Sequence, residues 1–279
     1  MDASQPTALT AADSLALRYG AEAAPTVGPW NDHLSLLLSH RSVRGYRPDA
    51  LPVGTLETLI AAAQSAATSS NLQTWSVIAV TDPDKKAALS KVAASQKHIV
   101  ECPLFLVWVA DISRNQRLGA QEGITLETMP YQETFLVAAI DAALAAQNAT
   151  VAAESLGLSC VYIGALRNDP QEVARIVGLP SGAMGVFGMC VGYASAAGAT
   201  EVKPRLPQDV VVHHNTYDST GEQAHRAAYD ALLTDFSKRN NMAVDTWTKR
   251  VAGRMGKIAA MAGRDKQVAT LHAMGFELK

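Results

Sequence analysis

The stretch YQETFLVAAIDAALAAQNATVAAESLG, residues 131–157, decides the fold. It is rich in alanine and apolar on most sides, and it ends at Gly157, a residue type that commonly terminates helices. The pattern predicts one long helix from about Tyr131 to Leu156. A helix that is apolar around most of its circumference is usually buried, so we expect it at the centre of the fold.

Shorter elements surround this helix in the sequence. Four runs rich in branched and aromatic residues predict strands at residues 74–82, 103–111, 158–166 and 184–194. Apolar spacing and proline positions predict helices at residues 32–39, 53–67, 83–94 and 169–178, and helical character over about the last 60 residues. Few strands among many helices indicate an α+β or α/β domain over residues 30–279. Residues 1–29 are predicted to be an N-terminal extension with one helix between Leu9 and Gly20.

Composition excludes several classes of protein. Charged residues make up 18% of the 279 residues and the formal net charge is -2, so no general attraction to nucleic acid or anionic lipid is expected. The apolar runs PLFLVWVA and FLVAAIDAALAAQ are shorter or more interrupted than the ~20 residues that cross a bilayer. The opening MDASQPTALTAADSLALRYG lacks the pattern of a secretory signal. We therefore expect a cytoplasmic protein without a membrane span, whose three separated cysteines are buried free thiols.

The sequence carries none of the common nucleotide, metalloprotease or hydrolase motifs. G-x-G-x-x-G after a strand, Walker A, H-E-x-x-H, G-x-S-x-G and C-x-x-C are all absent. His213 and His214 are adjacent, but no carboxylate or cysteine ligand stands near them, so we predict no metal site.

Two cationic motifs stand out against the low overall charge. SHRSVRGY brings His40, Arg41, Ser42 and Arg44 together, and these donors suit phosphate oxygens, although cations after a helix also complement its dipole. In KPRLP, Lys203 and the cation two residues later point the same way if the segment is extended, which suits an anion. On its own, however, a Lys-Pro-Arg in a loop is more often a solvated surface feature.

Two uncharged motifs could contact a ligand. Thr68, Ser69, Ser70 and Asn71 offer more hydroxyl and amide donors than a turn needs, but they also fit a solvated helix exit. The glycine of VYIGALRND, at the end of a strand, permits close approach of the backbone to a flat ligand.

Taken together and in this order, these motifs resemble those of the oxygen-insensitive, NADPH-dependent nitroreductase and flavin reductase group of the nitroreductase superfamily. The resemblance runs from about Leu34 to the C-terminus, through HRSVRGY, TSSNLQ, SQKH, AAQNATVAAESLGLSCVYIGALRN, VFGMCVGYA, KPRLP and the DTW of residues 245–247. It implies an α+β nitroreductase-like fold with a small, mostly antiparallel sheet surrounded by helices. It also implies an obligate homodimer with one tightly bound FMN in each active site at the dimer interface.

The resemblance assigns the FMN-binding residues individually. The phosphate and neighbouring atoms are assigned to His40, Arg41, Ser42, Lys203 and Arg205. The ring and ribityl chain are assigned to Thr68, Ser69, Gln73 and Gln96, and the ring face and its N5 to Tyr162 and the backbone of Ile163, Gly164 and Ala165. Arg44 is expected at the pyrimidine edge, where a cation stabilises negative charge on the reduced flavin.

The implied reaction is a ping-pong transfer of two electrons from NADPH or NADH to a nitroaromatic, a quinone or a similar small molecule, with the chemistry carried by FMN. Ser70 and Asn71 are expected to face the acceptor; the family commonly has an aromatic residue in place of Asn71 and a second glycine in place of Ala165. Lys238 and Arg239 stand near one arginine position that grips the 2'-phosphate of NADPH, whereas Ala243 occupies the other. Arg264 matches an arginine at the pocket mouth.

Three alternatives stay open at this stage. The chain could be a flavin reductase that supplies free reduced FMN, a flavin-binding protein without turnover, or a domain whose basic patches merely face solvent. A visible spectrum of the purified protein, and NAD(P)H oxidation that depends on an added acceptor, separate these alternatives.

Overall fold

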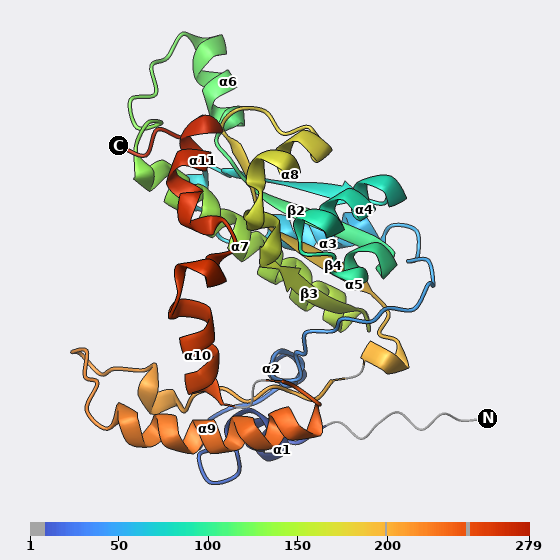
Figure 1. The fold of residues 1–279 in the computed structure, drawn as a ribbon, viewed down its shortest axis with the longest axis vertical. Helices are drawn as coiled ribbons and strands as arrows, with labels where there is room; N and C mark the ends of the chain where they lie inside the picture. The colour runs from blue at the N-terminus through green and yellow to red at the C-terminus, as the bar shows by residue number, and fades with distance from the viewer. Residues whose placement is uncertain (1–8, 199, 244–245) are drawn as a thin grey trace. The chain divides into compact units, whose positions relative to one another are not determined.

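The computed structural model describes residues 9–198, 200–243 and 246–279, and it divides into two compact units (Figure 1). The first unit holds the described residues of Met1–Arg41 and Thr200–Ala260, and the second those of Ser42–Ala199 and Met261–Lys279. Each unit is built from segments far apart in the sequence. The predicted boundary at residue 29 stays a prediction.

Four strands of the described chain form one sheet in the second unit. They are β1 (Trp75–Val80), β2 (Leu104–Asp111), β3 (Ser159–Ile163) and β4 (Ala183–Gly192), in the order β1-β2-β4-β3 with every neighbouring pair antiparallel. The small antiparallel sheet of an α+β fold is thereby confirmed. The prediction that the third strand runs to Leu166 is wrong, because the chain turns at Gly164 into a 3-10 helix, η2 (Gly164–Asn168).

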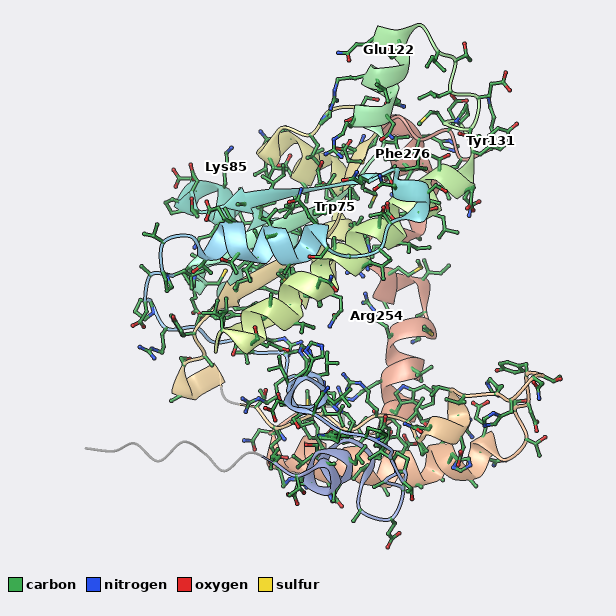
Figure 2. All side chains as sticks on the ribbon, turned by 180° about the vertical axis from the view of Figure 1, so that it is seen from behind. Trp75, Lys85, Glu122, Tyr131, Arg254 and Phe276 are labelled. Atoms are coloured by element: carbon green, nitrogen blue, oxygen red, sulfur yellow. The ribbon has the colours of Figure 1, made fainter. Side chains whose placement is uncertain are left out.

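Helices cover both faces of this sheet. One face is covered by α4 (Pro83–Val92), α5 (Lys97–Glu101) and α8 (Pro170–Val177), and the other by α3 (Thr55–Gln64) and α7 (Gln132–Ser155). Successive side chains of a strand point to opposite faces, so Phe105 and Val107 enter the first core and Leu106 and Trp108 the second. All eight residues of β2 are therefore buried. Trp108 also contacts Trp75, with ring centroids 5.6 Å apart. Trp75 is labelled in Figure 2.

The long helix α7 confirms the central prediction. Its buried face is mostly alanine, and these small side chains let the helix approach the sheet closely; the alanines are Ala138, Ala142, Ala145, Ala146, Ala149 and Ala153. By length and composition alone this helix could cross a bilayer, which the sequence had not predicted. In the fold it packs against β2 and α3 instead. Leu136, Ile140 and Leu144 nevertheless form an exposed stripe along it.

Two helices of the second unit were not predicted, and a third belonged only to the broad helical prediction for the C-terminal region. The polar helix α6 (Ser113–Glu122) follows β2 and ends at Gly123, and α5 is a single short helix before β2. The C-terminal α11 (Gln267–Ala273) packs into a smaller core with Met184 and Phe276. The three cysteines are buried free thiols, as expected.

The first unit is helical. It contains α1 (Ala11–Tyr19), α2 (Asp32–Leu38), α9 (Glu222–Arg239) and α10 (Trp247–Met255). Thr10 and Asp13 form a capping box that fixes the start of α1, with the Thr10 Oγ1 accepting the Asp13 N–H at 3.1 Å. Tyr229, Leu233 and Phe236 of α9 form the core of this unit.

Candidate functional site

Four predicted phosphate-binding residues lie in the first unit on two segments. His40 and Arg41 follow α2, while Lys203 and Arg205 follow Thr200. The Arg41 guanidinium donates to the Thr200 carbonyl at 3.4 Å, so the segments lie side by side. The side chains of both arginines are exposed, whereas His40 and Lys203 are half-buried. The structure thus gathers four side chains that can carry positive charge, from positions about 160 residues apart.

A buried arginine of α1 connects the two segments. Arg18 is 6% exposed, and its guanidinium donates to the carbonyls of Lys203 at 2.8 Å, Leu38 at 2.5 Å and His40 at 3.1 Å. Its own carbonyl accepts the Arg205 N–H at 2.7 Å. Sequence reasoning missed Arg18, because its partners are distant in the chain.

Ser42 and Arg44 belong to the second unit. Ser42 pairs with Cys160 of β3 in an isolated parallel bridge, and the Val43 N–H donates to the Cys160 carbonyl at 3.1 Å. The buried Tyr46 hydroxyl donates to the Val43 carbonyl at 2.9 Å. These contacts hold the backbone on both sides of Arg44, whose side chain is exposed.

A buried histidine provides a test of whether this region suits a polar ligand. Burial, followed by the positive charge of Arg44, holds the pKa of His98 below its usual value of 6.5. The His98 Nε2 is buried and has no hydrogen-bond partner among the described residues, an arrangement that costs about 1–3 kcal/mol. Gln96 starts the same helix, after Ala94 and Ser95 with positive φ angles of 59° and 58°. An unpartnered nitrogen near a cation fits the polar edge of a flavin.

The predicted contact segment Thr68–Gln73 is a strained turn. Ser70, Asn71 and Gln73 have positive φ angles of 48°, 55° and 51°, which non-glycine residues rarely adopt. Such strain is typical of functional sites and persists only where the surroundings enforce it. The side chains of Ser69, Ser70, Asn71 and Gln73 are exposed, so the turn presents its polar groups outward.

Asp141 of α7 enforces the shape of this turn. Its carboxylate, 1% exposed, accepts the Ser69 N–H at 3.1 Å, the Thr74 N–H at 3.3 Å and the Thr74 hydroxyl at 3.1 Å. Both ends of the turn are therefore tied to one side chain. The sequence signal was a carboxylate in the apolar middle of the helix, to which no role had been assigned.

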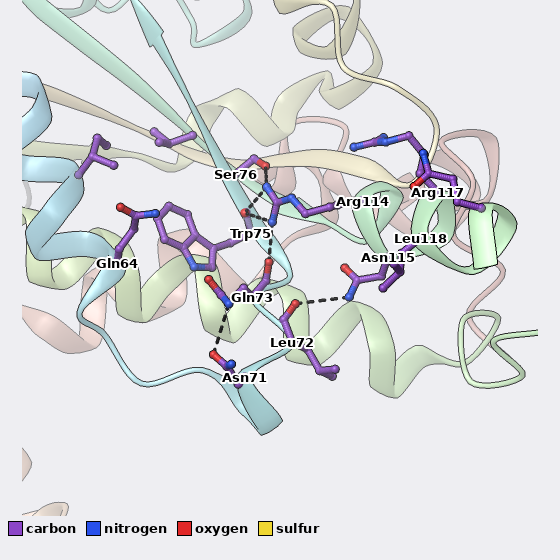
Figure 3. A pocket seen from close by; sticks show the side chains of 13 residues that line it. Gln64, Asn71, Leu72, Gln73, Trp75, Ser76, Arg114, Asn115, Arg117 and Leu118 are labelled. Carbon is purple, nitrogen blue, oxygen red and sulfur yellow. Dashed lines mark hydrogen bonds between the residues drawn. The ribbon is translucent and has the colours of Figure 1, made fainter. Parts of the chain in front are cut away.

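A cavity of about 840 Å³ lies beside the turn, within the second unit (Figure 3). Among the predicted residues it takes in Asn71 and Gln73; its other lining residues are Ile60, Gln64, Leu72, Trp75, Ser76, Val77, Arg114, Asn115, Arg117, Leu118 and Gln121. The Arg114 guanidinium donates to the Gln73 carbonyl at 2.8 Å and to the Ser76 hydroxyl at 2.9 Å. Arg114 thus holds the last residue of the turn, in addition to the contacts of Asp141.

The end of β3 is shaped by close contacts. Burial raises the pKa of Tyr162 to about 12, and its hydroxyl lies 2.8 Å from the Thr150 hydroxyl of α7. A Cβ added at Gly164 would lie 3.2 Å from the Arg167 Nη2, tighter than most such contacts. A glycine therefore fits this position better than a residue with a Cβ. The neighbouring Ala165 is partly buried and packs against the core.

Arg167 was not predicted, yet its guanidinium lies close to this backbone segment. It donates to the Val186 carbonyl at 2.6 Å, where the register between β2 and β4 shifts at a bulge. Arg264, predicted at a pocket mouth, donates from Nε at 3.0 Å and from Nη2 at 2.9 Å to the Asn168 Oδ1. Arg264 therefore contacts η2, and Arg167 ties η2 to β4.

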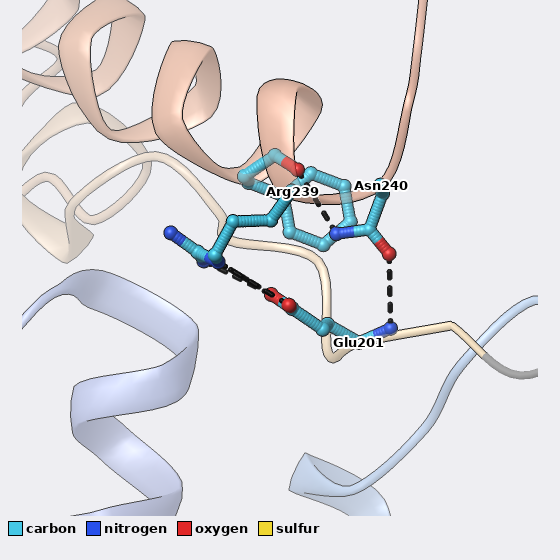
Figure 4. Close-up of polar contacts among 4 residues, drawn as sticks. Glu201, Arg239 and Asn240 are labelled. Carbon is cyan, nitrogen blue, oxygen red and sulfur yellow. Dashed lines mark hydrogen bonds and ion pairs between the residues drawn. The ribbon is translucent and has the colours of Figure 1, made fainter.

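The two cations predicted for NADPH end helix α9 in the first unit. The exposed Lys238 precedes Arg239, which forms an ion pair with Glu201, with Nη2 and Oε2 2.9 Å apart (Figure 4). This pairing lowers the pKa of Glu201. A nucleotide phosphate would have to compete with Glu201 for Arg239. Ala243 is described, whereas Asp245 of the DTW motif lies outside the described residues.

Comparisons with known proteins agree on one family. Residues 37–193 match the model of the nitroreductase family, and residues 203–279 match that of its C-terminal domain. The chain is 37% identical over 230 residues to an FMN reductase (NADPH) from Bacillus subtilis (strain 168), covering 81% of this chain and 92% of that protein. It is 36% identical over 222 residues to an oxygen-insensitive NADPH nitroreductase from Salmonella typhimurium (strain LT2), covering 78% and 88%.

Solved structures show the same relationship. B. megaterium NfrA2 aligns with a TM-score of 0.83 and 36% identity, over 90% of this chain and all of that one. The NADPH:FMN oxidoreductase from Vibrio harveyi complexed with NAD+ aligns with a TM-score of 0.79 and 32% identity, over 89% of this chain and all of that one.

Proposed function

Because the chain belongs to the nitroreductase family, we propose that it is an FMN-dependent NAD(P)H oxidoreductase that reduces nitroaromatics, quinones or similar electron-poor molecules. The observation that carries the proposal is the meeting of His40 and Arg41 with Lys203 and Arg205 in one unit. Such a cluster suits the dianionic phosphate of FMN. When bound, FMN supplies the transfer of two electrons between the nicotinamide and the acceptor.

We assign the polar edge of the flavin ring to the second unit. Arg44 projects from a fixed segment, and His98 has a buried nitrogen that needs a partner. The lowered pKa keeps His98 neutral near pH 7, so the positive charge at this point belongs to Arg44. The half-buried backbone turn after Ile163 would approach the ring, supported by Arg167.

The acceptor and the nicotinamide would be oriented by polar side chains rather than by a protein nucleophile. Ser70 and Asn71 are held outward by the strained turn, and they offer a hydroxyl and an amide to a nitro or quinone oxygen. Lys238 is the candidate contact for the 2'-phosphate of NADPH, with Arg239 held by Glu201. Arg264 stays the arginine proposed for the pocket mouth.

The proposal includes a homodimer in the cytoplasm. Leu136, Ile140 and Leu144 lie four residues apart on α7 and are 48%, 49% and 44% exposed, so they form an apolar stripe that a second copy would cover. The free cysteines suit a reducing compartment, where NAD(P)H is also generated.

A visible absorption spectrum of the purified protein tests the cofactor. Oxidised flavin bands, or their appearance when FMN is added back, support the proposal, and a colourless protein that takes up no FMN refutes it. Steady NADPH oxidation is then measured with a nitroaromatic, with a quinone and with free FMN.

Free FMN is included because relatives are named FMN reductase (NADPH) and NADPH-flavin oxidoreductase, which favours a flavin reductase as the second candidate. Turnover with nitroaromatic or quinone and retention of bound FMN support the main proposal. Turnover only with free FMN supports the second candidate.

A further inference from the structure

Helix α1 lies ahead of the part of the chain that matches the family, which begins at residue 37. Within the first unit it contributes one buried cation, Arg18, to the two segments proposed to bind the FMN phosphate. Its three hydrogen bonds reach the carbonyls of Leu38, His40 and Lys203. The partners at positions 38 and 203 are 20 and 185 residues away in sequence.

These carbonyls would oppose an anion if they were left unpaired. The last carbonyls of a helix such as α2 carry partial negative charge, and Leu38 is the last residue of that helix. The Lys203 carbonyl adds a third oxygen from the opposite segment. A guanidinium shared among the three neutralises them and fixes the backbone from which His40 and Lys203 project.

The segment after Lys203 is held equally firmly. The Arg205 N–H donates to the Arg18 carbonyl at 2.7 Å, and the Tyr229 hydroxyl donates to the Pro204 carbonyl at 3.0 Å. The course of this loop backbone is therefore fixed by contacts with α1 and α9. The Arg205 side chain is exposed, and its Nη1 donates to the carbonyls of Lys203 at 3.2 Å and Pro204 at 3.3 Å.

We infer that Arg18 is a positioning residue for the phosphate of FMN, holding two cationic segments in register and cancelling the carbonyl charge between them. The inference rests on the proposed function, and it gives the N-terminal helix a role in cofactor selection. Its specific consequence is that Arg18 contributes to the binding of FMN but not to that of riboflavin, which has the same ring and ribityl chain without the phosphate.

The test measures the dissociation constants of apoprotein for FMN and for riboflavin by quenching of flavin fluorescence. Arg18→Met keeps an unbranched apolar side chain and removes the guanidinium. We expect the preference for FMN over riboflavin to fall about tenfold or more, because displaced cationic segments would weaken about one charge-assisted hydrogen bond to the phosphate. Riboflavin binding should be unchanged. Arg18→Lys retains the charge but cannot reach three carbonyls, so an intermediate preference is expected.

Thr10→Ala is the matched control, because it removes the cap of α1 without touching Arg18. A full preference for FMN in Arg18→Lys and Arg18→Met overturns the inference, and so does an equal loss for both ligands or an equal effect of Thr10→Ala. If Arg18→Met does not fold, Arg18→Lys alone decides by the same comparison. A wild-type protein that binds neither flavin refutes the proposed function itself, whereas a wild type that prefers FMN and variants that keep this preference refute only the role of Arg18.

Discussion

Replacing Asp141 should destabilise the protein by an amount that its three hydrogen bonds allow us to work out. Thr74 is 2% exposed, so removing the carboxylate leaves its N–H and hydroxyl without a partner or water. Each unsatisfied buried group costs about 1–3 kcal/mol. The Ser69 N–H belongs to an exposed residue and can turn to solvent, so its loss adds little. Asp141→Ala is therefore expected to lower the free energy of unfolding by about 2–6 kcal/mol.

Asp141→Asn separates the charge from the shape of the side chain. The amide oxygen can still accept from Thr74. The NH₂ group would face the Ser69 N–H and cannot accept from it, but solvent can provide that N–H with another acceptor. We expect a loss of about 1–2 kcal/mol. The turn that carries Ser70 and Asn71 should relax from its strained angles, so kcat/KM for the acceptor should fall in both variants.

Urea unfolding followed by circular dichroism measures the stability, with the surface variant Glu172→Gln as control, since Glu172 pairs only with the exposed Arg175. An Asp141→Ala protein within about 1 kcal/mol of wild type would refute the view that this carboxylate enforces the turn.

Three further predictions concern other parts of the molecule. Because the pKa of His98 is lowered in the folded state, protonation of His98 favours the unfolded chain. The contribution of His98 to the free energy of unfolding is therefore complete above about pH 6.5 and is lost progressively below it. Urea unfolding near pH 7.5 and pH 5.5 should show a smaller decline in stability for His98→Gln than for the wild type. Ile140→Lys should yield monomers in light scattering after size exclusion, whereas Val53→Lys at a fully exposed position should not. Glu201→Gln should free Arg239 and lower KM for NADPH a few-fold with little change for NADH, and equal changes for both would contradict the assignment.

Much of the fold could be predicted because its signals are local. The apolar run of β2 reflects burial on both faces of the strand, and the alanine pattern of α7 reflects one helix face packed closely against the sheet. The end of β3 was misjudged because apolar residues continue through Leu166, although Gly164 already permits the turn. Helix α6 was missed because its sequence, SRNQRLGAQE, is polar and buries little.

The candidate site was predictable to a different extent. Cations and hydroxyls are recognisable as candidate ligand contacts from their residue type alone, and the cationic residues around positions 40 and 203 do meet in one unit. The residues that position them cannot be recognised in this way. Asp141 acts on a turn about 70 residues earlier in the chain, and Arg18 acts on Lys203, 185 residues away. No local pattern distinguishes such a residue from an ordinary charged one.

The discontinuous first unit also constrains the order of events during synthesis. Its early segment ends at Arg41 and its later one begins at Thr200, so Arg18 leaves the ribosome long before Lys203 exists. At about 5–20 residues per second the delay over these 185 residues is on the order of 9–37 s. The second unit has most of its sheet available during that interval, whereas the cationic cluster cannot form. If this cluster binds the FMN phosphate as proposed, FMN is captured through its phosphate only after residue 205 has been synthesised, when all four strands of the sheet already exist.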